Sequence, residues 1–321
     1  MNAGAKAFHN GAYYLRTMDR RQLLTVGVGA LVGGFVLPRR AWPQEPAIAS
    51  LNDRLSVVAR ARTNVVALST GDGLILVDSG TAQYRDALMD SLRQLAQSSR
   101  ISKVFNTHYH PDNTGANELL RESGATIVAH ENTRLWMATP IWVPAEDRYR
   151  SPRPKAAQPT ETFRVKGSMV AGRERIDYGY LIDAHTNGDI YIYFRDSNVL
   201  AVGDVLSPVA DPELDYLTGA WLGGRVDALT RLLALSDANT KIVPGYGPVL
   251  NRVYLQTEHD VMKTLYDRAV DRIRQGDDAG DMLDAGVMNG IGRTWKDPKK
   301  FLYDVQKGLW AHHNKLNPNV V

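Results

Sequence analysis

The chain of 321 residues contains no cysteine. This absence excludes disulfides, thiolate nucleophiles, iron–sulfur clusters and cysteine-ligated zinc, so a metal site has to use histidine, aspartate, glutamate or water. Long apolar runs are scarce as well. The one candidate, at 23–37, has 15 residues, whereas a transmembrane helix needs about 20. With 44% hydrophobic and 23% charged residues, the rest of the composition is that of an ordinary globular protein.

The chain also has little net charge, +3. Residues 1–49 contain six basic and two acidic residues, and the remainder contains 32 basic and 33 acidic residues. The basic excess therefore belongs to the N-terminal segment. The remainder gives no reason to expect a nucleic-acid partner.

The N-terminal segment resembles a twin-arginine export signal. Arg20 and Arg21 precede the apolar run, and the small-x-small sequence at 47–49 follows it, which is the order found in secretory signals. This interpretation predicts transient contact with export machinery, cleavage, no stable membrane anchor afterwards and a periplasmic location. An uncleaved anchor and a buried helix are the alternatives.

The predicted domain organisation follows from this signal. Residues 1–49 are the export signal with an upstream extension, and residues 50–321 form one domain. Its core spans about 55–250, and a helical C-terminal extension spans 251–321, with a polar tail from Asp277. No repeat or low-complexity tract divides the domain.

Hydrophobic periodicity predicts strands that are interrupted twice by helices, which favours two packed sheets with helices outside. The predicted strands lie at 55–60, 64–69, 73–78, 101–106, 126–129, 178–182, 189–194, 198–202 and 241–243, and the predicted helices at 84–97, 117–123, 225–234 and 258–274. The segment 140–159 contains five prolines. It is predicted to be a surface excursion that forms one wall of a cleft.

The most informative residues are His108, His110 and Asp112, directly after the predicted strand at 101–106. Alternate side chains of an extended segment share a face, so these three can converge on one point. A solitary loop histidine is usually solvated or hydrogen-bonded. Two histidines and an aspartate at this spacing instead indicate a metal site.

Three further residues follow predicted strands. His185 lies in the turn before the strand at 189–194, and Asp78 and Asp204 each end an apolar strand, where a carboxylate has little structural purpose. Each is weak evidence by itself. Their order along the chain is more specific.

Together these residues resemble the metallo-beta-lactamase superfamily. Its pattern runs through an aspartate at a strand end, His-x-His-x-Asp-His, a histidine in a Gly-His-Thr-like turn, Gly-Asp and a late Gly-His-Gly. The resemblance covers about 55–250. It implies an α+β fold, a four-layer αββα sandwich with the metal site at the edge between two sheets.

The resemblance also assigns roles to the residues. The three imidazoles of a first zinc site would be His108, His110 and His185. Of the carboxylates, the resemblance implies that Asp112 belongs to a second site, that Asp204 bridges the two sites, and that Asp78 orients a ligand imidazole.

Two positions depart from the family pattern. Asn113 stands where the first motif has its last histidine, and Tyr246 replaces the histidine of Gly-His-Gly. Because both are poor metal donors, we predict one tight zinc and a weak or absent second metal. Tyr246 either assists catalysis beside Asp112 or only fills the space of the missing imidazole.

The resemblance implies a zinc-dependent hydrolase that acts on the carbonyl of a small lactam, lactone, ester or thioester. In this reaction zinc activates the attacking water, and Asp112 orients that water or accepts its proton. Two alternatives remain open. One is a mononuclear iron oxygenase of the same fold, since histidine and carboxylate also suit iron, and the other is a catalytically impaired periplasmic binding or accessory protein.

Overall fold

The computed structural model describes residues 48–95, 100–143 and 147–312. Residues 1–47 of the predicted export signal lie outside the described residues. Among the helices that the structure describes, none is both long enough and apolar enough to cross a membrane.

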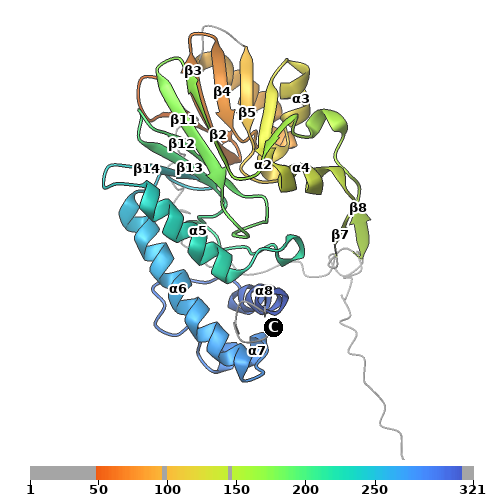
Figure 1. Ribbon diagram of the computed structural model, residues 1–321, viewed down its shortest axis with the longest axis vertical. Helices are drawn as coiled ribbons and strands as arrows, with labels where there is room; N and C mark the ends of the chain where they lie inside the picture. Colours follow the sequence, from red (N-terminus) through yellow and green to blue (C-terminus); the bar gives the residue numbers. More distant parts are fainter. Residues whose placement is uncertain (1–47, 96–99, 144–146, 313–321) are drawn as a thin grey trace, which may run out of the picture. The chain divides into compact units, whose positions relative to one another are not determined.

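The first sheet has seven strands in the order β1-β2-β3-β4-β5-β6-β9, and Figure 1 labels its central strands β2 to β5. Neighbouring strands from β1 to β4 are antiparallel, and those from β4 to β9 are parallel. The strands are β1 (Ile48–Ser50), β2 (Leu55–Ala61), β3 (Thr63–Thr70), β4 (Gly73–Val77), β5 (Ile101–Phe105), β6 (Thr126–His130) and β9 (Glu161–Phe163).

The second sheet has five strands in the order β10-β11-β12-β13-β14, of which only β13 and β14 pair in parallel. The strands are β10 (Lys166–Ala171), β11 (Glu174–Tyr180), β12 (Ile190–Phe194), β13 (Val199–Gly203) and β14 (Lys241–Pro244). A separate hairpin, β7 (Ile141–Val143) and β8 (Arg148–Arg150), lies within the predicted excursion at 140–159.

Strand alternation explains how the sheets pack. In β12, Ile190, Ile192 and Phe194 face the first sheet, whereas Tyr191 and Tyr193 face a helical layer. Successive side chains of a strand point to opposite faces. Because both faces are apolar, the strand is buried on both sides.

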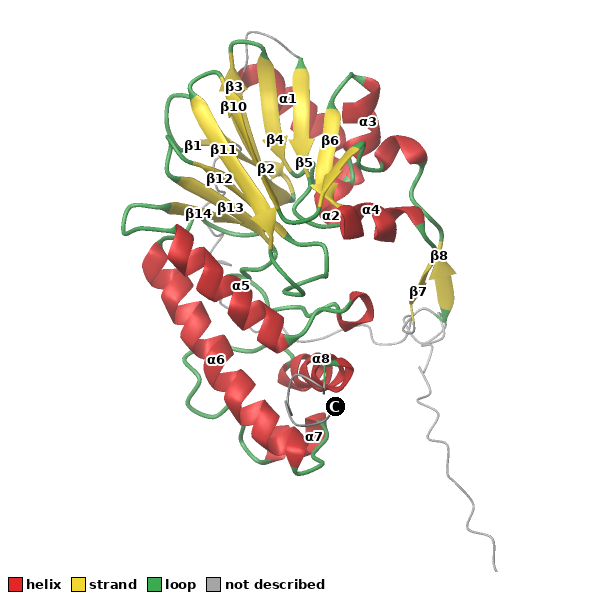
Figure 2. Ribbon diagram, viewed as in Figure 1, coloured by secondary structure: helices red, strands yellow, loops and turns green. Residues whose placement is uncertain are grey.

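Helices cover the outer face of each sheet (Figure 2). Helices α1 (Arg85–Leu95) and α3 (Asn117–Glu122) pack on the first sheet. On the second sheet lie α5 (Leu222–Leu235), α6 (Arg252–Arg274) and α8 (Pro298–Ala311). The remaining helical segments are α2 (Pro111–Thr114), α4 (Glu131–Ala138), α7 (Ala279–Asp284) and the 3-10 turns η1 (Ala82–Tyr84), η3 (Lys155–Ala157) and η4 (Tyr216–Thr218). The predicted four-layer αββα sandwich is confirmed.

The structure differs from the predictions near both ends of the domain. Residues Ile48–Ser50 pair with β2, so the first sheet begins two residues before the predicted boundary at 50. The C-terminal extension is helical, but α8 is not polar, since Phe301, Val305 and Leu309 are buried against the other helices. These residues recur every four positions and form an apolar face. The lysines and the aspartate between them made the segment look polar in the sequence.

Candidate metal centre

The predicted site residues come together at one edge of the two sheets. His108, His110 and Asp112 follow β5, and Asp78 follows β4. Because β4 and β5 are parallel, both of these strands end at the same edge. The backbone N–H of Ile190 in the second sheet donates to the Thr107 carbonyl at 2.9 Å, which joins the sheets beside the site.

The three imidazoles converge, one ligand nitrogen from each lying within 4.8 Å of the others. His185 Nε2 faces His110 Nδ1 at 3.0 Å. His108 Nε2 is buried and has no hydrogen-bond partner among the described residues. The three nitrogens that point inward are therefore His108 Nε2, His110 Nδ1 and His185 Nε2.

The outer nitrogen of each ring is held by the protein. His108 Nδ1 lies 3.1 Å from Thr107 Oγ1, and His185 Nδ1 lies 3.0 Å from the Glu213 carbonyl oxygen. His110 Nε2 lies 3.3 Å from Asp215 Oδ2. Such outer contacts fix the tautomer and orientation of metal-binding histidines.

The protonation of His108 and His185 suits a metal site. Burial lowers the pKa of His108, and it lowers the pKa of His185 to about 3. Neighbouring imidazoles add to both shifts. Both rings are therefore neutral at physiological pH, which is the form that binds a metal.

His110 and Asp215 form an ion pair when no metal is bound, whereas a metal at Nδ1 would displace one of the two ring protons and leave Nε2–H to donate to Asp215. Burial opposes the charge on each group, but their hydrogen bond and mutual attraction outweigh it. The pKa of His110 is raised to about 9, and the pKa of Asp215 lies below its usual value. Tyr109 Oη also donates to Asp215 Oδ2, at 2.6 Å. Asp215 is thereby fixed from two sides and in turn fixes the ring of His110.

Asp204 lies beside the three imidazoles. Its Oδ2 lies 3.9 Å from both His108 Nε2 and His185 Nε2, and its Oδ1 is buried without a hydrogen-bond partner among the described residues. Burial raises the pKa of Asp204 to about 8, and the nearby Asp112 charge adds to the shift. Unpartnered buried polar atoms need an explanation. A cation among the three rings would supply a partner for both His108 Nε2 and the carboxylate, so these residues fit a bound metal.

Gly245 makes room for this carboxylate. A Cβ atom at this position would lie 1.8 Å from Asp204 Oδ1. Every other residue type would therefore displace Asp204.

The two replacements of the family histidines are engaged within the protein. The Tyr246 hydroxyl donates to Asp112 Oδ2 in a short hydrogen bond. Asn113 Nδ2 donates to Asp78 Oδ2 at 3.1 Å. The structure thus places Tyr246 beside the site but turns the Asn113 amide toward Asp78.

The side-chain partners of Asp78 are Thr107 and Asn113, and none of the three histidines bonds to it among the described residues. It accepts hydrogen bonds from the N–H and the hydroxyl of Thr107, both at 2.7 Å. Because Thr107 Oγ1 is also the contact of His108, Asp78 orients this ring through Thr107 and not directly. Sequence reasoning missed Thr107 although it stands inside the motif, and it missed Glu213 and Asp215, which carry no local signal.

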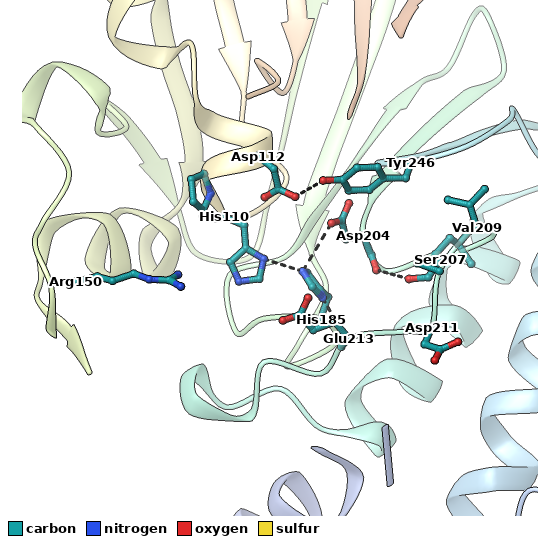
Figure 3. A pocket seen from close by; sticks show the side chains of 13 residues that line it. His110, Asp112, Arg150, His185, Asp204, Ser207, Val209, Asp211, Glu213 and Tyr246 are labelled. Carbon is teal, nitrogen blue, oxygen red and sulfur yellow. Dashed lines mark hydrogen bonds and ion pairs between the residues drawn. The ribbon is translucent and has the colours of Figure 1, made fainter. Parts of the chain in front are cut away.

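The site opens into a cavity of about 330 Å³ (Figure 3). Its lining includes His110, Asp112, Arg150, His185, Asp204, Ser207, Glu213 and Tyr246. Arg150 belongs to β8, so the excursion at 140–159 does form part of the cleft wall. A small molecule in this cavity can reach the rings of His110 and His185.

Replacing Asp215 by alanine is expected to lower metal affinity by about 10–100-fold, which is typical for the outer partners of metal ligands. The variant loses the hydrogen bond to His110 Nε2 and leaves this ring free to turn. Chelator competition measures the change. Asp196→Ala is the control, because Asp196 is also a carboxylate that accepts a hydrogen bond, from the N–H of Arg175, and it does not line this cavity. Equal affinity in both variants would contradict the prediction.

Comparison with known proteins agrees with this geometry. The family model described as "Metallo-beta-lactamase superfamily" matches residues 59–268. The chain belongs to this superfamily. The match includes all eight predicted site residues, from Asp78 to Tyr246.

Among curated superfamily relatives, the type 2 metallo-beta-lactamase of Bacillus cereus is 24% identical over 204 residues, which cover 63% of this chain and 73% of that protein. The metallo-beta-lactamase from Pontibacter korlensis is a similar solved structure, with a TM-score of 0.53 and 17% identity over 67% of this chain and 98% of that one. The DIM-1 metallo-beta-lactamase has a TM-score of 0.54 and 16% identity over 68% and 96%. At this identity the solved structures show a common fold.

Proposed function

We propose that the protein is a zinc-dependent hydrolase that cleaves a small lactam, lactone, ester or thioester. The observation that carries this proposal is the convergence of three imidazoles, each held by the protein at its outer nitrogen. Histidine nitrogens with an open fourth position are the usual donors of catalytic zinc. Zinc bound there would lower the pKa of a water molecule and polarise the substrate carbonyl.

In this proposal Asp112 accepts the proton of the attacking water. Its Oδ2 accepts from Tyr246, and within the described residues no side chain bonds to Oδ1. Both residues line the cavity. Asp112 Oδ1 can therefore accept a proton from water while Tyr246 fixes the carboxylate.

Tyr246 is a donor in this arrangement. Burial and the Asp112 carboxylate raise the pKa of Tyr246 above its usual value, so the phenol keeps its proton. A protonated hydroxyl at the cavity wall can also donate to a negatively charged oxygen that forms during the reaction.

One metal rather than two is supported by the same contacts. A second metal beside Asp112 would compete with the Tyr246 hydroxyl for the carboxylate. Asn113 offers no imidazole, and its amide nitrogen is bonded to Asp78. We therefore infer one tight zinc.

Metal analysis together with a hydrolysis panel tests the proposal. Purified protein should retain one equivalent of zinc after dialysis and hydrolyse at least one colorimetric lactam, lactone, ester or thioester. Activity that survives His108→Ala would show that hydrolysis does not come from this site. Two retained equivalents would contradict the single-metal inference, bound iron would favour an oxygenase, and bound metal without hydrolysis would favour an accessory protein.

Tyr246→Phe is expected to lower kcat by about 10–100-fold with a smaller change in KM, because it removes one donor at the reacting oxygen and releases Asp112. Steady-state kinetics on a substrate found in the panel measure both constants. Tyr254→Phe is the control, since Tyr254 lies on α6 outside this cavity. Unchanged kcat would mean that Tyr246 only fills space.

We further propose export by the twin-arginine route and a periplasmic location for the mature protein. The support is the order of Arg20, Arg21 and the apolar run in the sequence. Replacing both arginines by lysine should keep the protein in the cytoplasm, as cell fractionation would show. Unimpaired export would contradict this route.

A further inference from the structure

A second cavity adjoins the cavity of about 330 Å³ beside the three imidazoles, which we call the metal cavity. The second cavity measures about 200 Å³ and shares His110, Pro111, Arg150 and Glu213 with the first. His110 is one of the three converging imidazoles. A molecule whose reacting group reaches the metal can therefore extend into this second cavity.

The wall of the second cavity is mainly apolar. Six of its lining residues are aromatic or aliphatic, namely Tyr109, Trp136, Met137, Ile141, Val143 and Leu217. Trp136 and Met137 belong to α4, and Ile141 and Val143 belong to β7. Charged side chains, including Arg150 and Arg153, also line it.

The polar atoms of the aromatic residues are already satisfied inside the protein. Tyr109 Oη donates to Asp215 Oδ2 at 2.6 Å, and Trp136 Nε1 donates to Asn187 Oδ1 at 2.6 Å. A polar group that packs against this aromatic face would lose its bonds to water without gaining one from either ring, which is unfavourable. An apolar group loses no such bonds.

The size of the cavity suits one ring or a branched aliphatic group. An apolar protein cavity of roughly 150 Å³ holds benzene. The second cavity, at about 200 Å³, has room for a ring of this size. Burying such a group would add about 25 cal/mol per Å² of apolar surface to binding.

We propose that the second cavity binds an uncharged aromatic or branched aliphatic group of the substrate while the carbonyl lies in the metal cavity. This inference rests on the proposed hydrolase function for its catalytic consequence. The binding of the apolar group itself does not depend on hydrolysis. The two can therefore be tested separately.

The first test measures binding without a reaction. The probe is 4-fluorobenzyl alcohol, followed by fluorine NMR on the protein as purified, with trifluoroethanol as a hydroxyl control that lacks the ring. Leu217→Trp places an indole at the cavity wall and should weaken probe binding at least five-fold. Leu135→Trp is the matched control, because Leu135 lies on α4, is exposed and lines neither cavity.

The outcomes of this test are distinct. Ring-dependent binding that Leu217→Trp weakens and Leu135→Trp does not would support the proposal. No binding, equal binding to all three proteins, or equal binding of trifluoroethanol would overturn it.

The second test compares the hydrolysis of three esters. Methyl acetate has no ring, methyl phenylacetate has the ring on the acyl side of the ester bond, and benzyl acetate has it on the alcohol side. One ring-bearing ester should exceed methyl acetate at least ten-fold in kcat/KM, and this preference should fall at least five-fold in Leu217→Trp. Equal kcat/KM for all three esters would overturn the inference. If no ester, lactam, lactone or thioester is hydrolysed, the proposed function fails, and the NMR result alone decides the binding site.

Discussion

Replacing His185 by alanine should remove the metal from the protein and abolish hydrolysis. His185 Nε2 is one of three nitrogens that face one another, and two imidazoles cannot complete a tetrahedral zinc site with one open position. Replacing a residue that only hydrogen-bonds to a metal ligand lowers metal affinity by up to roughly 100-fold. Because His185 would be a ligand itself, we expect a larger loss. Elemental analysis and chelator competition measure the loss.

The control for this variant is His259→Ala. His259 lies on α6 and contacts Thr230 and Asp260, away from the cavity. This variant should retain one equivalent of metal and full activity. One equivalent of tightly bound metal in His185→Ala would show that these three imidazoles are not the metal site.

Replacing Arg225 by methionine should lower the free energy of unfolding by about 3–5 kcal/mol, because it removes two hydrogen bonds from a charged donor, each worth about 1.5–3 kcal/mol. Arg225 is fully buried on α5. Its guanidinium donates to Ser207 Oγ at 3.1 Å and to the Glu213 carbonyl at 3.3 Å. The variant also removes a positive charge that attracts the buried Glu258. The ion pair between Glu258 and Arg293 stays in place.

This substitution should reach the metal site as well. The Glu213 carbonyl that Arg225 holds is also the contact of His185 Nδ1. A displaced carbonyl would let the ring turn, so metal affinity should fall together with stability. Urea unfolding in the presence of a chelator separates the loss of stability from the loss of bound metal.

Arg231→Met on the same helix is the matched control. Arg231 donates one hydrogen bond, to the Tyr180 carbonyl at 2.7 Å, and does not contact the cleft loop. Its replacement should lower stability by about 1 kcal/mol and leave metal affinity unchanged. An equal loss of stability in the two arginine variants would contradict the role assigned to Arg225.

Most strands of the two sheets and the first motif could be predicted because their signals are local, although the periodicity did not reveal β1, β9 or β10. Alternating apolar residues, as in Ile190, Ile192 and Phe194, directly reflect the period of a strand with two buried faces. His108 and His110 are likewise close in sequence. The predicted extended segment is wrong, since residues 107–109 are bends and Asp112 lies in α2, but this short local turn still brings the two rings together.

The surroundings of the metal centre could not be predicted in this way. Asp215 lies more than 100 positions from His110, and Tyr246 lies more than 130 positions from Asp112. Nothing in their neighbouring residues marks these contacts. They depend on how the loops after β13 and β14 pack against the loop after β5.

The sequence by itself therefore determined the layered fold, the three imidazoles and the loss of the two family histidines. Only the tertiary structure decided what holds each ring, what the replacements Asn113 and Tyr246 contact, and that an apolar cavity adjoins the site. The physical reason is the range of the interactions. Periodicity and motif spacing act within a segment, whereas outer hydrogen bonds and cavity walls form between segments that only folding brings together.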